Sequence, residues 1–134
     1  MEERLFASQL AGGALSTADA SIVVAEWTDR GGGHEPPVYI APLHIHREDD
    51  EAWYVLDGRL GFTVGEREVE VESGGSIVVP RNTWHTYWNA SDGPTHYLLV
   101  MTPRIHRLIE ALHRGDRRDY ARIFEEHDSE LLQP

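Results

Sequence analysis

Short runs of β-forming residues, each ended by turn residues, fill the stretch from Val38 to Met101. The runs recur about every 8–12 residues, a spacing typical of β-sandwiches and β-barrels. The run EREVEVE at 66–72 alternates strictly, so its valines share one face and its glutamates the other. Such a strand is half buried, with one face on a core and one in water. Because the run SIVVAEW from Ser21 is also rich in β-branched residues, we predict an all-β barrel over about residues 20–102.

The dipeptide Asp57-Gly58 separates two of these runs, EAWYVL and RLGFTV. Asp-Gly is favoured in the two-residue turns of β-hairpins. We therefore expect a tight hairpin at this position.

The hydrophobic period changes after Pro103. An apolar face at helical spacing is followed by Gly115, a plausible helix stop, and by a second group at similar spacing. The first face consists of Ile105, Leu108, Ile109 and Leu112, and the second group of Tyr120, Ile123, Phe124 and His127. These patterns predict a tail of two short helices over 103–134, packed on the outside of the barrel or across a dimer.

Length and composition exclude several classes of protein. The chain has 134 residues, which favours one domain over 1–134, and its formal net charge of −11 would repel nucleic acid. Every basic residue is an arginine and cysteine is absent, which excludes a lysine Schiff base and thiolate metal sites. The N-terminal MEERLFASQLAGG does not resemble a signal peptide, and no run of about 18 apolar residues indicates a membrane span. We expect a cytoplasmic protein with no membrane partner.

Two histidines one residue apart, His44 and His46, lie in a predicted strand. Since strand side chains alternate, both imidazoles share a face, with Cα atoms about 6.6 Å apart. Both rings can reach one metal ion at about 2.0–2.1 Å. Glu51 opens the next strand after the REDD turn and is the natural third ligand, and His85 is a candidate for the fourth. The remaining histidines are expected to be structural or exposed: His34, His96, His106, His113 and His127.

The order and spacing of these residues resemble the two motifs of the cupin family. The first motif reads G-x5-H-x-H-x3-4-E-x6-G, and residues 44–58 read HIHREDDEAWYVLDG. The second reads G-x5-P-x-G-x2-H-x3-N, and it is matched by Gly74, Pro80, His85 and Asn89.

Two positions depart from the motifs. Val38 stands at the first glycine of the first motif, and Asn82 replaces the glycine after Pro80. Both are turn positions, and asparagine tolerates a positive φ. Neither change affects a predicted ligand.

The resemblance covers roughly residues 38–101 and implies a double-stranded β-helix, or jelly-roll, barrel. It further implies that His44, His46, Glu51 and His85 bind a divalent metal ion inside the barrel mouth. The family spacing also admits Asp50 as the carboxylate, but the reach of glutamate and the six-residue gap to Gly58 favour Glu51. The other acidic residues of this turn, Glu48, Asp49 and Asp50, are expected to be solvated.

Strand parity divides the aromatic residues and two valines of these strands into two sets. Five side chains of inward parity are candidates for a substrate pocket above the metal: Trp53, Val55, Phe62, Val64 and Tyr87. Three aromatic side chains of outward parity predict a dimer surface or a seat for the helical tail: Tyr54, Trp84 and Trp88. We expect a homodimer, which the family resemblance also implies.

A site of three histidines and one carboxylate suits Fe, Mn, Ni, Cu or Zn. An octahedral ion with four protein ligands keeps two open positions for water, dioxygen or a chelating substrate. We therefore predict a metal-dependent oxidoreductase of the dioxygenase type that acts on a small oxygen-bearing organic substrate, with Glu51 as the catalytic proton acceptor. Two alternatives stay open, a non-enzymatic cupin that binds or senses a small-molecule ligand and an isomerase that uses the metal as a Lewis acid.

Overall fold

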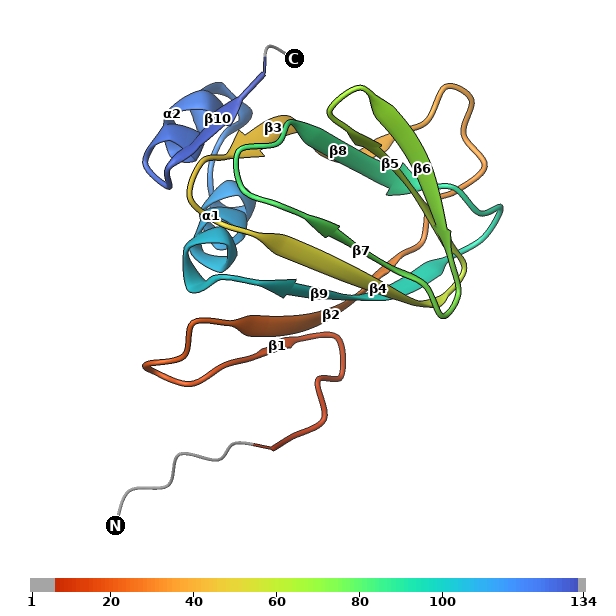
Figure 1. Ribbon diagram of the computed structural model, residues 1–134, viewed down its shortest axis with the longest axis horizontal. Helices are drawn as coiled ribbons and strands as arrows, with labels where there is room; N and C mark the ends of the chain where they lie inside the picture. Colours follow the sequence, from red (N-terminus) through yellow and green to blue (C-terminus); the bar gives the residue numbers. More distant parts are fainter. Residues whose placement is uncertain (1–6, 133–134) are drawn as a thin grey trace.

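The computed structural model describes residues 7–132, which form two facing antiparallel sheets with short helices near the C-terminus (Figure 1). Each sheet has five strands. In the order of pairing, the first sheet contains β1 (Ala14–Leu15), β2 (Val23–Asp29), β9 (Thr95–Met101), β4 (Glu51–Asp57) and β7 (Ser76–Val79). The second contains β10 (Ser129–Leu131), β3 (Tyr39–His46), β8 (His85–Asn89), β5 (Arg59–Val64) and β6 (Arg67–Glu72).

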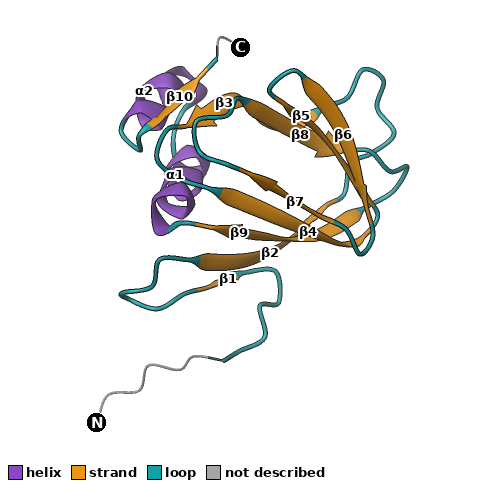
Figure 2. Cartoon of the chain, in the orientation of Figure 1, coloured by secondary structure: helices purple, strands orange, loops and turns teal. Residues whose placement is uncertain are grey.

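This arrangement confirms the predicted jelly-roll barrel. The chain crosses repeatedly from one sheet to the other, so strands that follow one another in sequence often lie in opposite sheets (Figure 2). The inward faces pack large side chains that are almost fully buried, among them Trp53, Leu60, Phe62 and Leu99. Burial of each such side chain contributes about 1.5–3 kcal/mol relative to exposure.

The predicted hairpin at Asp57-Gly58 is wrong. β4 pairs with β7 and β9, whereas β5 pairs with β6 and β8, so the dipeptide is a corner between the sheets. Gly58 has φ +92°, and a Cβ there would lie 2.4 Å from the hydroxyl oxygen of Thr95. Positive φ and close approach require glycine at this corner, as they would in a tight turn.

Asn82 confirms the reasoning about the second motif. It adopts φ +65°, the conformation for which the motif glycine is usually needed. Its backbone N–H donates a 2.6 Å hydrogen bond to the carbonyl of His46, which ties this turn to the end of β3.

The C-terminal helices form where the helical spacing of apolar residues predicted them. α1 (Pro103–Arg114) begins after Thr102, whose hydroxyl accepts a hydrogen bond from the Ile105 N–H, and it ends at Gly115. The short helix η1 (Arg117–Asp119) leads into α2 (Tyr120–Glu125). Within residues 7–132 no helix combines the length and the apolar character needed to cross a bilayer.

The position of this tail differs from the expectation. α1 and α2 lie at one open end of the barrel (Figure 1), where their apolar side chains line an internal cavity, rather than on its outer surface. After α2 the chain forms β10, a strand that the sequence analysis missed, which pairs with β3. The tail is therefore part of the barrel mouth.

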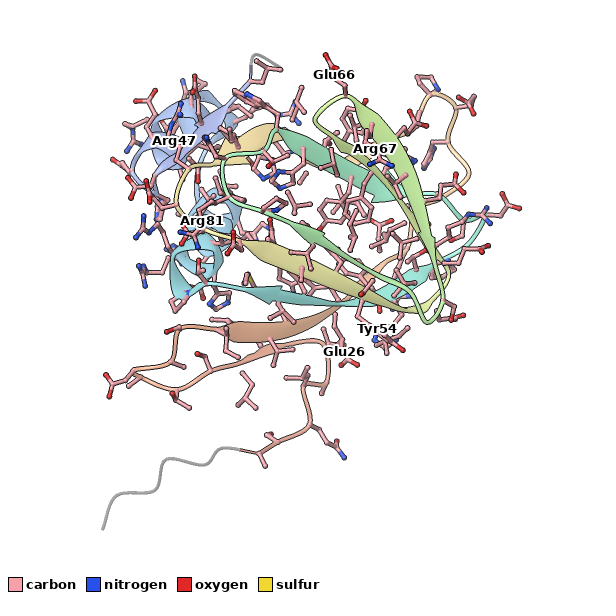
Figure 3. The ribbon with its side chains drawn as sticks, in the orientation of Figure 1. Glu26, Arg47, Tyr54, Glu66, Arg67 and Arg81 are labelled. Atoms are coloured by element: carbon pink, nitrogen blue, oxygen red, sulfur yellow. The ribbon has the colours of Figure 1, made fainter. Side chains whose placement is uncertain are left out.

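Two of the three outward aromatic residues are less exposed than expected. Trp88 is buried, because Gly61 leaves room for its ring and the ring of Tyr39 packs 5.8 Å away. Trp84 is half-buried. Tyr54 is exposed and lies on the outer side of the first sheet, as Figure 3 shows. Trp88 thus packs against Tyr39 and Gly61, and the homodimer stays a prediction.

The outer face of the first sheet carries an apolar row that crosses all five strands. Strand register aligns its members side by side: Leu15, Val24, Val100, Ala52 and Val78. Val78 is exposed and the other four side chains are half-buried, so the row is a continuous, partly exposed apolar strip. Because contiguous apolar surface marks interaction sites, we expect the second copy of a homodimer to pack on this row.

A charge placed in the row should dissociate the dimer. We expect Val78→Arg to weaken self-association at least about tenfold, because an arginine would have to be desolvated in the interface. Sedimentation at micromolar concentration measures this change. Val38→Arg is the matched control, since Val38 is 63% exposed and Val78 is 64% exposed, but Val38 lies outside both sheets. A monomeric parent protein would refute the prediction.

Candidate metal centre

Three strands bring the four predicted ligands to one end of the barrel. His44 and His46 lie at the end of β3, and His85 begins β8, where it pairs with His44. Glu51 begins β4 in the facing sheet. All four side chains are buried, so the group lies between the two sheets.

The donor atoms of these residues are close enough to bind a single ion. The Nε2 atoms of His44 and His46 are 3.1 Å apart, and Oε1 of Glu51 lies 3.3 Å from Nε2 of His46 and 3.3 Å from Nε2 of His85. All four donor atoms lie within 4.8 Å of one another. Two ligands at about 2.1 Å from one ion lie about 3.0 Å apart at octahedral and about 3.4 Å at tetrahedral angles. The three contacts of 3.1, 3.3 and 3.3 Å match this range.

Hydrogen bonds on the far side of each ring set which nitrogen faces the centre. Nδ1 of His44 lies 2.5 Å from the Pro42 carbonyl, and Nδ1 of His85 lies 2.9 Å from the Thr83 carbonyl. A carbonyl only accepts, so each Nδ1 carries a proton. Each Nε2 then has a lone pair directed at the centre, unless the ring is doubly protonated. Metal-binding histidines are held in the same way in proteins.

The third ring is held by the C-terminal strand. Nδ1 of His46 lies 2.8 Å from the hydroxyl of Ser129, a buried residue of β10 that pairs directly with His46. The same hydroxyl donates a 3.0 Å hydrogen bond to the carbonyl of His127, so its lone pair is left to accept from His46. Phe124 of α2 packs against His44, with ring centroids 5.3 Å apart. The tail thus orients two of the four ligands.

Electrostatics favour a cation at the centre. Burial, together with the neighbouring His85 and His46, lowers the pKa of His44 to about 3, so this ring is neutral near pH 7. Burial alone would raise the pKa of Glu51, but hydrogen bonds from His46 and His85 outweigh it and hold the pKa of this carboxyl below its usual range. A bound metal ion would add positive charge beside this ionised carboxylate.

The acidic turn before Glu51 is directed away from the centre. Asp50 accepts hydrogen bonds from the backbone N–H and the guanidinium of Arg81, which lower the pKa of its carboxyl. Asp49 is buried rather than solvated, with Oδ2 3.6 Å from Nε of Arg104 in α1. The structure therefore places Glu51, and neither aspartate, beside the imidazoles.

A cavity of about 350 Å³ opens from the ligand group. Of the predicted pocket residues, Trp53 and Tyr87 line it. Val55 and Phe62 are fully buried in the core, and Val64 packs against that core from a half-buried position. Phe62 stacks behind Tyr87 at 5.5 Å, which explains its place, because parity fixes the face of a strand but not the depth of a residue.

Sequence reasoning missed most of the remaining wall. From the barrel come Trp27 and Tyr97, and from the tail come Ile109, Leu112, Tyr120 and Phe124. The apolar face of α1 was visible in the sequence, but its partner surface was not. His113, expected to be structural or exposed, is exposed and also lies on the cavity rim.

Comparison with known proteins identifies one family. A family model described as the cupin domain matches residues 33–101. An uncharacterised protein of Methanocaldococcus jannaschii is 33% identical over 61 residues, which make up 46% of this chain and 49% of that protein. The match spans about half the length of this relative.

Solved structures show the same fold. A cupin protein of Bacteroides fragilis aligns with a TM-score of 0.60 at 18% identity, over 76% of this chain and 86% of that one. A protein of Bacillus halodurans aligns with a TM-score of 0.56 at 26% identity, over 67% of this chain and 67% of that one. The first likeness concerns the fold alone.

Loss of the Ser129 hydroxyl should weaken metal binding. We expect Ser129→Ala to reduce the affinity for a divalent transition-metal ion about 10- to 100-fold, because His46 loses the partner that orients its ring. Competition with a fluorescent chelator measures the affinity.

Two variants serve as controls. Ser129→Thr keeps a hydroxyl and should restore most of the affinity. Ser73→Ala removes an exposed hydroxyl that donates to the Leu56 carbonyl, away from the centre, and should change nothing. Equal affinities for Ser129→Ala and the parent protein would contradict the assigned role.

Proposed function

The chain belongs to the cupin family, and we propose that it is a metal-dependent oxidoreductase of the dioxygenase type that acts on a small oxygen-bearing organic substrate. The observation that carries this proposal is the contact between the ligand group and the cavity. His44, His46 and Glu51 form part of the cavity wall, so a ligand in the cavity meets the donor atoms directly. A purely structural metal site would be closed on all sides.

The donor set defines the chemistry available. A divalent transition-metal ion bound by these residues supplies Lewis acidity and, when the ion is redox-active, electron transfer. Three imidazoles and one carboxylate suit Fe, Mn, Ni, Cu and Zn, and ligand type alone does not select among them.

Glu51 is the proposed proton acceptor. Its contacts with the rings of His46 and His85 are made by Oε1, which leaves Oε2 to accept the proton of a substrate hydroxyl. The carboxylate is ionised when the substrate arrives, so Oε2 has a lone pair that can accept this proton. Loss of that proton converts an enol or phenol into an electron-rich anion.

The surrounding aromatic residues keep water from this anion. Trp53 packs edge-on against His85 at 6.0 Å and against Tyr87 at 5.3 Å, and Phe124 covers His44. In the proposed reaction both atoms of one O₂ molecule enter the product and the substrate supplies the electrons. No external reductant is needed.

Oxygen uptake tests this function. The protein loaded with iron or nickel should consume O₂ with at least one member of a panel of diketones, flavonols and catechols, and ¹⁸O₂ should label the product with two atoms. We expect Glu51→Gln to lower kcat by about 10²- to 10⁴-fold, since the base is lost. Asp50→Asn is the matched control, because Asp50 is the adjacent carboxylate and faces Arg81.

Each of the other possible results indicates a different function. Absence of uptake with every metal would refute the oxidoreductase. A gain in Tm with a panel member but no product would instead indicate a binding protein. Product formation under argon would indicate an isomerase.

A further inference from the structure

The cavity lining combines the ligand group with an otherwise largely apolar wall. His44, His46 and Glu51 lie beside apolar side chains of the C-terminal helices, including Ile109, Leu112 and Phe124, and Phe124 packs directly against His44. Aromatic rings of the barrel complete the wall, among them Trp27 and Trp53. A molecule that directs its polar atoms at the ligand group therefore meets apolar side chains around the rest of its surface.

No basic side chain other than histidine lines this cavity in the described part of the chain. The lining contains no arginine, and the sequence contains no lysine. Its carboxylates are Glu51 and Asp29, and Asp29 accepts a hydrogen bond from the amide of Asn89. A negative charge on the body of a ligand would be desolvated beside like charges and without a partner, which is costly. The cavity therefore disfavours phosphorylated and polycarboxylate compounds.

A few neutral hydrogen-bonding groups lie along the wall. Nε1 of Trp53 is buried and has no hydrogen-bond partner among the described residues. The hydroxyls of Tyr87 and Tyr97 lie 3.0 Å apart. Burial raises the pKa of Tyr97 to about 12, so this side chain stays a neutral phenol. These groups can satisfy one neutral acceptor on a ligand.

The size of the cavity limits the ligand further. Its volume of about 350 Å³ is at the small end of the roughly 300–1,000 Å³ range of small-molecule sites. The space suits one or two rings with a short substituent.

We propose that the substrate is a small, predominantly apolar or aromatic compound that is uncharged apart from a chelating pair of oxygens at one end. This substrate class rests on the proposed function, because the oxygen pair is placed at the ligand group. The apolar body lies against α1 and α2, so the C-terminal tail selects the substrate.

Three catechols that share the same pair of hydroxyls and differ in the 4-substituent isolate the contribution of the rest of the ligand to the affinity. Calorimetry with zinc-loaded protein under argon, at about pH 8 where histidine is ordinarily neutral, measures binding without turnover. We expect 4-tert-butylcatechol to bind about 10- to 100-fold more tightly than catechol, because its alkyl group is buried. We expect 4-sulfocatechol to bind more weakly than catechol. The proposal is overturned if the sulfonate binds as tightly as the alkyl compound or if none of the three binds.

A substitution at the rim tests the charge argument directly. His113→Arg adds a permanent cation at an exposed position of α1 that lines the cavity. It should strengthen binding of 4-sulfocatechol about tenfold by pairing with the sulfonate, while binding of 4-tert-butylcatechol stays unchanged. His106→Arg, on the same helix but outside the cavity lining, should change neither affinity. If His113→Arg does not improve binding of 4-sulfocatechol, the substituted side of the ligand does not lie against α1, and this part of the proposal is wrong.

A metal-free measurement separates this proposal from the proposed function. Phenols lack the chelating pair, so their binding reports the cavity wall alone, through quenching of the fluorescence of Trp27 and Trp53. We expect 4-tert-butylphenol to quench this fluorescence at a concentration at least about tenfold lower than 4-phenolsulfonate does. This order should hold even if no O₂ is consumed with any metal, and the reverse order would refute the substrate class.

Discussion

The arrangement of the barrel mouth depends on the convergence of three imidazole nitrogens and one carboxylate oxygen in a buried space. Buried polar atoms must be paired, or they cost free energy. The far side of each ring is paired with Pro42, Thr83 or Ser129. The near sides face one another at about hydrogen-bond distance, and their lone pairs repel unless a cation or protons lie between them. The site is therefore built to hold positive charge.

The C-terminal tail serves this centre in two ways. Ser129 and Phe124 hold two ligand rings, while Ile109 and Leu112 enclose the space in front of them. The family match ends at residue 101, before α1 begins. Ligand orientation and cavity shape thus depend partly on residues outside the matched domain, and membership of the family does not define the substrate.

Sequence predicted the features that depend on fixed local spacing. The His-x-His pair and Glu51 converge because strand alternation and one short turn determine the directions of their side chains. The C-terminal helices follow from the helical spacing of apolar residues alone. Features that depend on distant partners were not predictable. Asp57-Gly58 has the same local chemistry in a hairpin and in a corner between sheets. Strand parity placed Phe62 inward, but only the packing of Tyr87 against it shows that it lies behind the cavity wall. The strand β10 has three residues, too few for a periodic signal.

Selectivity in such a cavity arises as much from what the wall lacks as from what it offers. In a medium of low dielectric constant, an unpaired charge on a ligand is penalised more strongly than an apolar contact is rewarded. The wall around Trp53 and Tyr87 offers neutral donors, and Asp29 adds a carboxylate to the lining. In the proposed mode of binding, an anionic group is therefore tolerated at one place, beside the donor atoms that would hold the cation. This asymmetry orients a ligand before any chemistry occurs, because only its oxygen-bearing end can be accommodated at the ligand group.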